Sequence, residues 1–78
     1  MDPATHPLLN RELYARAESA AQAAFEIYRN DHPADRVRKM DRAAMTVFRK
    51  AGTAPDVRKV FAMSISADIM EREVYSRR

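Results

Sequence analysis

Cysteine is absent from this 78-residue sequence. The chain can therefore form neither disulfides nor thiolate metal sites, which support many very small domains. A folded chain of this length buries only about 60% of the surface that its unfolded form exposes. Oligomerisation is the remaining way to bury more apolar surface, and we therefore expect a homo-oligomer.

Glycine occurs only once, and no apolar run approaches the ~20 residues of a membrane-spanning helix. The single glycine excludes phosphate-binding loops, which need several glycines so that backbone N–H groups can approach the phosphate. The first seven residues include an early acid and lack the apolar core of a signal peptide. These absences predict a cytoplasmic protein that does not contact a membrane, of the kind found among bacterial or phage accessory proteins.

Proline marks the starts of three predicted helices, because it is well tolerated in the first helical turn. After an N-terminal tail at residues 1–6, we expect helices at about 7–29, 33–50 and 55–77 within a single domain, 1–78. Asp31 or His32 should cap the second helix, and Gly52 should end it in the left-handed conformation. Thr53 and Asp56 resemble a capping box for the third helix. Short turns predict an all-α, three-helix antiparallel bundle.

The first two helices each have one apolar face. On the first helix the predicted inner residues are Leu9, Leu13, Ala17, Ala20, Ala24 and Ile27, with Tyr14, Ala21, Phe25 and Tyr28 beside them. On the second they are Val37, Met40, Ala44, Val47 and Phe48.

The third helix has two apolar stripes on nearly opposite sides. One consists of Val57, Phe61, Ile65 and Ile69, and the other follows the 3-4-3-4 spacing of a coiled-coil seam: Val60, Met63, Ala67, Met70 and Val74. A helix that has one side exposed to solvent cannot bury both stripes within a single chain. We therefore predict that the second stripe mediates self-association and that the bundle is dimeric through its C-terminal helix.

Positive charge is concentrated between residues 36 and 59, although the formal net charge is only +3. On the second helix this charge forms a candidate partner-binding ridge, Arg38, Lys39, Arg42, Arg49 and Lys50. The ridge fits three interpretations: an ordinary solvated face, a surface for an acidic protein, or a surface that follows a nucleic-acid backbone.

Residues suited to catalysis do not form a recognisable constellation. The serines fall within predicted helices, and the carboxylates, such as Glu18 and Asp68, are typical of solvated helix faces. His6 and His32 each precede a proline at opposite ends of the first helix, roughly 30 Å apart, too far to share a metal ion. The sequence therefore predicts no catalytic residues, cofactor or metal.

These patterns predict a small non-enzymatic interaction protein, an inhibitor or regulator that docks on a larger partner. The alternative is a small dimeric nucleic-acid-binding regulator that uses the basic ridge, and a third is a structural subunit of an enzyme complex. The sequence does not identify the partner.

Overall fold

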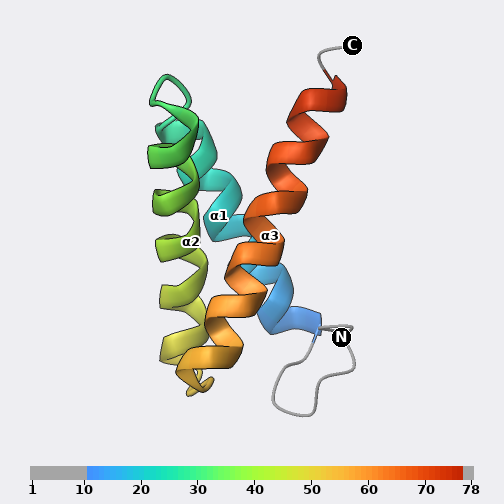
Figure 1. Ribbon diagram of the computed structural model, residues 1–78. Helices are drawn as coiled ribbons and strands as arrows, with labels where there is room; N and C mark the ends of the chain where they lie inside the picture. Colours follow the sequence, from blue (N-terminus) through green and yellow to red (C-terminus); the bar gives the residue numbers. More distant parts are fainter. Residues whose placement is uncertain (1–10, 77–78) are drawn as a thin grey trace.

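The computed structural model describes residues 11–76, which form three α-helices (Figure 1). These are α1 (Arg11–Ile27), α2 (Pro33–Lys50) and α3 (Pro55–Ser76). Consecutive helices run in opposite directions, and α3 crosses in front of α1 while its C-terminal turns diverge from α2 (Figure 1). The predicted all-α fold is confirmed. None of the described helices is long and apolar enough to cross a lipid bilayer.

The two ends of α2 follow the local chemistry expected from the sequence. His32 caps the helix, since its Nδ1 atom accepts a hydrogen bond from the Ala34 N–H at 3.1 Å. After the last turn, Gly52 has a φ of +83°, and its N–H donates to the Arg49 carbonyl at 3.0 Å. A residue with a β-carbon would be strained there, which explains why the chain uses its glycine at this point.

The other boundaries differ in part from the predictions. Helix α1 ends at Ile27 rather than residue 29, because the chain turns so that the Asp31 N–H donates to the Tyr28 carbonyl at 3.0 Å. The predicted tail at residues 1–6, the helix start at residue 7 and the placement of Leu9 and His6 lie outside the described residues, as does the predicted end of α3 at residue 77.

The predicted capping box before α3 is wrong. The Ala54 carbonyl accepts the hydrogen bond of the Arg58 N–H at 2.9 Å, so Ala54 holds the N-cap position and cannot cap with its side chain. The Thr53 hydroxyl is buried instead and has no hydrogen-bond partner among the residues described. Thr53 is one residue too early in the chain to serve as the N-cap.

The core lies between the three helices, and each of them contributes a buried phenylalanine: Phe25 from α1, Phe48 from α2 and Phe61 from α3. Met40, Ala44 and Phe48 are fully buried, and the ring centroids of Phe48 and Phe61 lie 6.4 Å apart. Small residues from α1 allow the helices to approach closely; the buried residues of α1 are Leu13, Ala17, Ala21, Ala24 and Phe25. From α3 the buried residues are Phe61, Ala62, Ile65, Ser66 and Ile69.

One predicted core residue lies on the surface. The Ile27 side chain is 73% exposed, although its spacing from Ala20 and Ala24 suggested the inner face. Ile27 lies at the edge of the buried side of α1, whose centre is formed by Ala17, Ala21 and Ala24, and it borders the contact with α2 without being covered by it. Ala20, seven residues earlier on the same edge of α1, is half-buried.

Candidate interaction surfaces

The second apolar stripe of α3, which we call the α3 seam, is exposed. Val60, Met63 and Val74 are 63%, 53% and 56% exposed, respectively. Ala67 is also exposed, whereas Met70 is half-buried and packs against the edge of the core. The opposite stripe fills the core, with Phe61, Ile65 and Ile69 buried and Val57 half-buried. The α3 seam therefore leaves apolar surface uncovered on the side of α3 that faces away from α1 and α2.

The basic ridge is divided by local ion pairs. Arg38 pairs with Asp35 at 3.2 Å, and Lys39 pairs with Asp31 at 2.6 Å. The Lys39 ammonium also lies 4.1 Å from the centre of the Tyr28 ring. The hydrogen bond to Asp31 raises the pKa of Lys39, so this side chain remains charged at neutral pH but shares its charge with a neighbour.

The other ridge cations have no acidic partner within residues 11–76. Arg42 and Arg49 line a shallow depression together with Arg58 of α3, whereas Lys50 lines a separate depression beside α1. Arg58 donates to the Thr53 carbonyl at 3.3 Å, which holds its guanidinium beside α2. The helical periodicity of α2 could not reveal this cluster, because its third member comes from another helix.

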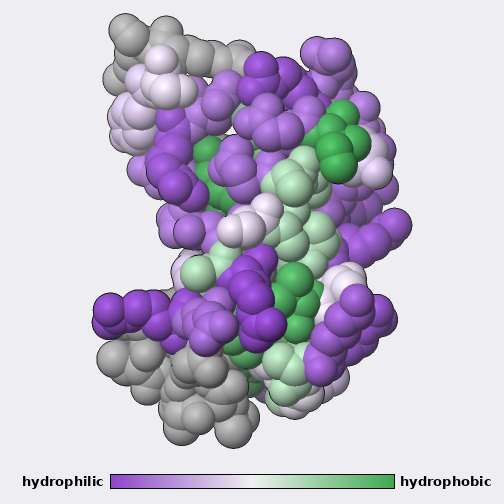
Figure 2. Space-filling view, turned by 180° about the vertical axis from the view of Figure 1, so that it is seen from behind, coloured by the Kyte–Doolittle hydropathy of each residue, from purple (hydrophilic) through white to green (hydrophobic). Residues whose placement is uncertain are grey.

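A second apolar surface, the α1–α2 groove, was not predicted from the sequence. Two adjoining depressions follow the contact between these helices, and Figure 2 shows them as a green band running down this face. Alanine is the main residue at the bottom of this groove, and its small side chain leaves the helix backbones accessible. The apolar residues of the groove include Ala20, Ala23, Ile27, Ala43, Val47 and Leu13.

Positive side chains border the α1–α2 groove. Arg16 and Lys50 lie at one end, and Lys39 and Arg42 lie toward the other. Among the described residues, neither depression is lined by a carboxylate, and Arg16, Arg42 and Lys50 form no ion pair. The sequence contained this surface only as separate features: the small residues of the first helix and the two lysines of the basic ridge on the second.

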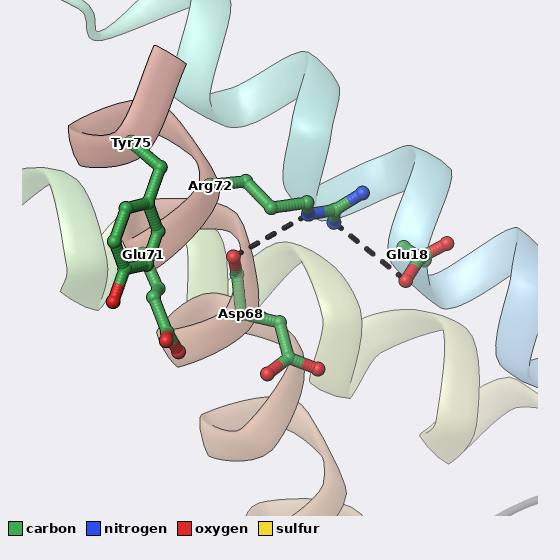
Figure 3. A pocket seen from close by; sticks show the side chains of 5 residues that line it. All are labelled: Glu18, Asp68, Glu71, Arg72 and Tyr75. Carbon is green, nitrogen blue, oxygen red and sulfur yellow. Dashed lines mark hydrogen bonds and ion pairs between the residues drawn. The ribbon is translucent and has the colours of Figure 1, made fainter. Parts of the chain in front are cut away.

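A third depression, between α1 and α3, is polar (Figure 3). Arg72 crosses it, with its guanidinium 3.8 Å from the Glu18 carboxylate and 3.4 Å from the Asp68 carbonyl oxygen. Glu71 and Tyr75 lie on the other side of the same turn (Figure 3). The sequence predicted that these carboxylates lie on solvated helix faces. The half-exposed Arg72–Glu18 ion pair contributes at most about 1 kcal/mol to the free energy of unfolding.

The phenol of Tyr14 lies near this depression. Burial raises its pKa, the negative charges of Asp68 and Glu18 add to the increase, and a hydrogen bond with Ser64 opposes it. Tyr14 is therefore neutral at physiological pH and serves as a packing residue at the edge of the core.

Within residues 11–76, no three His, Asp or Glu side chains lie close enough together to hold a metal ion. The chain matches no protein-family model, no curated protein and no solved structure. The α3 seam, the arginine cluster and the α1–α2 groove are therefore the features from which a function can be argued.

Proposed function

We propose that this protein is a non-enzymatic interaction module, an inhibitor or regulator, that docks on a larger partner through the α1–α2 groove. In this proposal the docked segment is an acidic amphipathic helix, and the protein self-associates through the α3 seam. The observation that carries the proposal is an apolar groove with a cationic border and no carboxylate in its described lining.

The shape and the charge of the groove support a helical occupant. An amphipathic helix docks by placing its apolar residues along a groove, and a floor of small side chains allows the two backbones to approach closely. Arg16, Arg42 and Lys50 carry charge that no neighbouring acid within residues 11–76 neutralises. Acidic residues at the edges of a docked helix would pair with these cations. This electrostatic attraction accelerates association and selects against basic partners.

The position of the α3 seam supports self-association alongside docking. Its exposed apolar residues belong to α3, whereas none of the described residues that line the α1–α2 groove comes from α3. A second copy can therefore cover the seam without covering the α1–α2 groove. A domain this small gains stability when a partner covers further apolar surface, so self-association and a stable fold support each other.

Crosslinking tests the groove directly. We expect a photoreactive residue in place of Ala23 to capture an acidic amphipathic segment of a protein from cells of the natural host. The double substitution Arg16→Glu/Lys50→Glu should reduce this capture about ten-fold or more, because it reverses charge at the border of the groove. The measurement is the yield of the crosslinked peptide and its sequence by mass spectrometry.

The matched control is Arg38→Glu/Arg49→Glu, which makes the same change in net charge on α2 outside the groove lining. This variant should retain capture. If it loses capture as completely as the groove variant, or if the crosslinked segments are neither acidic nor helical, the groove is not the docking site.

The cluster of Arg42, Arg49 and Arg58 favours nucleic acid as a second candidate partner. If each arginine neutralised one phosphate, the log–log salt dependence of binding would have a slope of about −2.7. We expect generic duplex DNA to bind no more tightly than about 10 µM at about 150 mM salt, the range of non-specific contacts. Fluorescence anisotropy measures both quantities, and a nanomolar complex lost in Arg49→Glu would replace the docking proposal.

A further inference from the structure

The residue types of the α3 seam have a symmetric order, although its 3-4-3-4 spacing becomes 4-3-4-3 on reversal, a difference of one residue at the two methionines. Its five residues, Val60, Met63, Ala67, Met70 and Val74, read Val–Met–Ala–Met–Val in either direction along the helix. The smallest side chain stands at the centre, and the two valines stand seven residues on either side of it. A surface with this order is self-complementary when a second copy approaches with its helix reversed.

We propose that two copies pair antiparallel through their α3 seams, around a two-fold axis that passes beside Ala67. This inference rests on the proposed self-association and specifies its geometry. Val60 then lies level with Val74 of the second copy. Met63 stands four residues before Ala67 and Met70 three after it, so Met63 lies about 1.5 Å along the helix from the level of Met70 of the second copy. Ala67 meets its own equivalent at the crossing point, where a small side chain permits the shortest distance between helix axes.

Charges beside the seam favour the same orientation. Lys59 and Glu73 flank the seam on one side, at equivalent positions two heptads apart, and side chains at such positions face each other across an antiparallel helix pair. Lys59 of each copy then pairs with Glu73 of the other, and the symmetry makes this contact twice. In a parallel pair Lys59 would instead face Ser64, which offers no compensating charge.

Exposure of the participating residues supports this arrangement. Lys59 is exposed and forms no ion pair with another residue in the described range 11–76. Val60 and Val74, at the two ends of the seam, are both more than half exposed. Pairing the same patch of two copies gives a closed dimer, so no apolar seam remains to recruit further copies.

Engineered cysteines test the orientation, because the natural chain contains none. In the antiparallel dimer the two Val60 positions lie about 21 Å apart along the helix, well beyond the reach of a disulfide. We therefore expect Val60→Cys alone to form little crosslinked dimer under mild oxidation. An equimolar mixture of Val60→Cys and Val74→Cys should give the mixed disulfide as the main product, measured by non-reducing electrophoresis and mass spectrometry.

Charge reversal provides an independent test. Lys59→Glu and Glu73→Lys should each weaken dimerisation about ten-fold at low ionic strength, and the double variant Lys59→Glu/Glu73→Lys should restore it. The matched control Lys59→Glu/Glu71→Lys has the same net charge, but position 71 lies on the other flank of the seam and should not rescue. Sedimentation equilibrium measures the dissociation constants, and circular dichroism checks that each variant remains helical.

The outcomes separate this inference from the proposal on which it rests. A wild-type protein that stays at its monomer mass of 8.9 kDa would overturn self-association itself. A dimer in which Val60→Cys crosslinks with itself, or in which the double charge swap does not rescue, would overturn only the antiparallel pairing.

Discussion

Replacing Phe48 by alanine is expected to lower the free energy of unfolding by about 3–5 kcal/mol. The Phe48 side chain is completely buried, and its ring packs 6.4 Å from that of Phe61 between α2 and α3. Alanine would leave a cavity at the place where the short turn holds the two helices together. Because the free energy of unfolding of a small domain is only about 5–15 kcal/mol, this single substitution removes a large part of it.

Urea unfolding followed by circular dichroism measures this loss. The matched control is Ile27→Ala, which also removes a large apolar side chain but from a position that is 73% exposed. We expect the control to change the unfolding free energy by less than about 0.5 kcal/mol. A loss below about 1 kcal/mol for Phe48→Ala would mean that this ring does not fill the core as described.

The sequence predicted most of the fold because its helix signals are local. Pro33 and Pro55 stand in the first turns of their helices, and His32 and Gly52 bound α2 through short-range geometry. Apolar periodicity likewise identified the buried faces of α2 and α3. None of these signals depends on how distant parts of the chain pack.

The errors arose where tertiary packing decides the outcome. Ile27 has the spacing of a core residue, but it lies at the edge of the contact between α1 and α2 and remains exposed. Thr53 has the chemistry of an N-cap, but the start of α3 at Pro55 gives that position to Ala54. In both cases the residue type was informative, but periodicity could not predict its exact position relative to the neighbouring helix or to the helix end.

The interaction surfaces likewise divide into one that local sequence signals predict and two that depend on how the helices pack. The α3 seam is visible in the sequence, because all its residues belong to one helix. The α1–α2 groove and the arginine cluster each combine residues of two helices, so they emerge only when the helices are placed side by side. The five residues of the predicted ridge all belong to α2, but they differ in their partners. Lys39 pairs with Asp31, whereas Arg42 lines both the groove and the depression of the arginine cluster.

A single acidic residue within the α3 seam is expected to dissociate the protein. Met63 is 53% exposed in the single chain, so Met63→Glu should leave the core of each copy intact while placing a charge in an apolar contact. Burying that charge costs about 2–4 kcal/mol, which weakens association by roughly 30- to 1000-fold. Met63 is preferred to Met70 for this test, because Met70 also packs against the core of its own chain.

Sedimentation equilibrium at micromolar concentration should show self-association in the wild-type protein and monomers in Met63→Glu. Ala15→Glu adds the same charge at an exposed position of α1 and should leave association unchanged. The melting temperature should also rise with concentration in the wild-type and Ala15→Glu proteins but not in Met63→Glu, because association stabilises only the folded chain. Equal association of the two variants would show that the α3 seam is not the contact between copies.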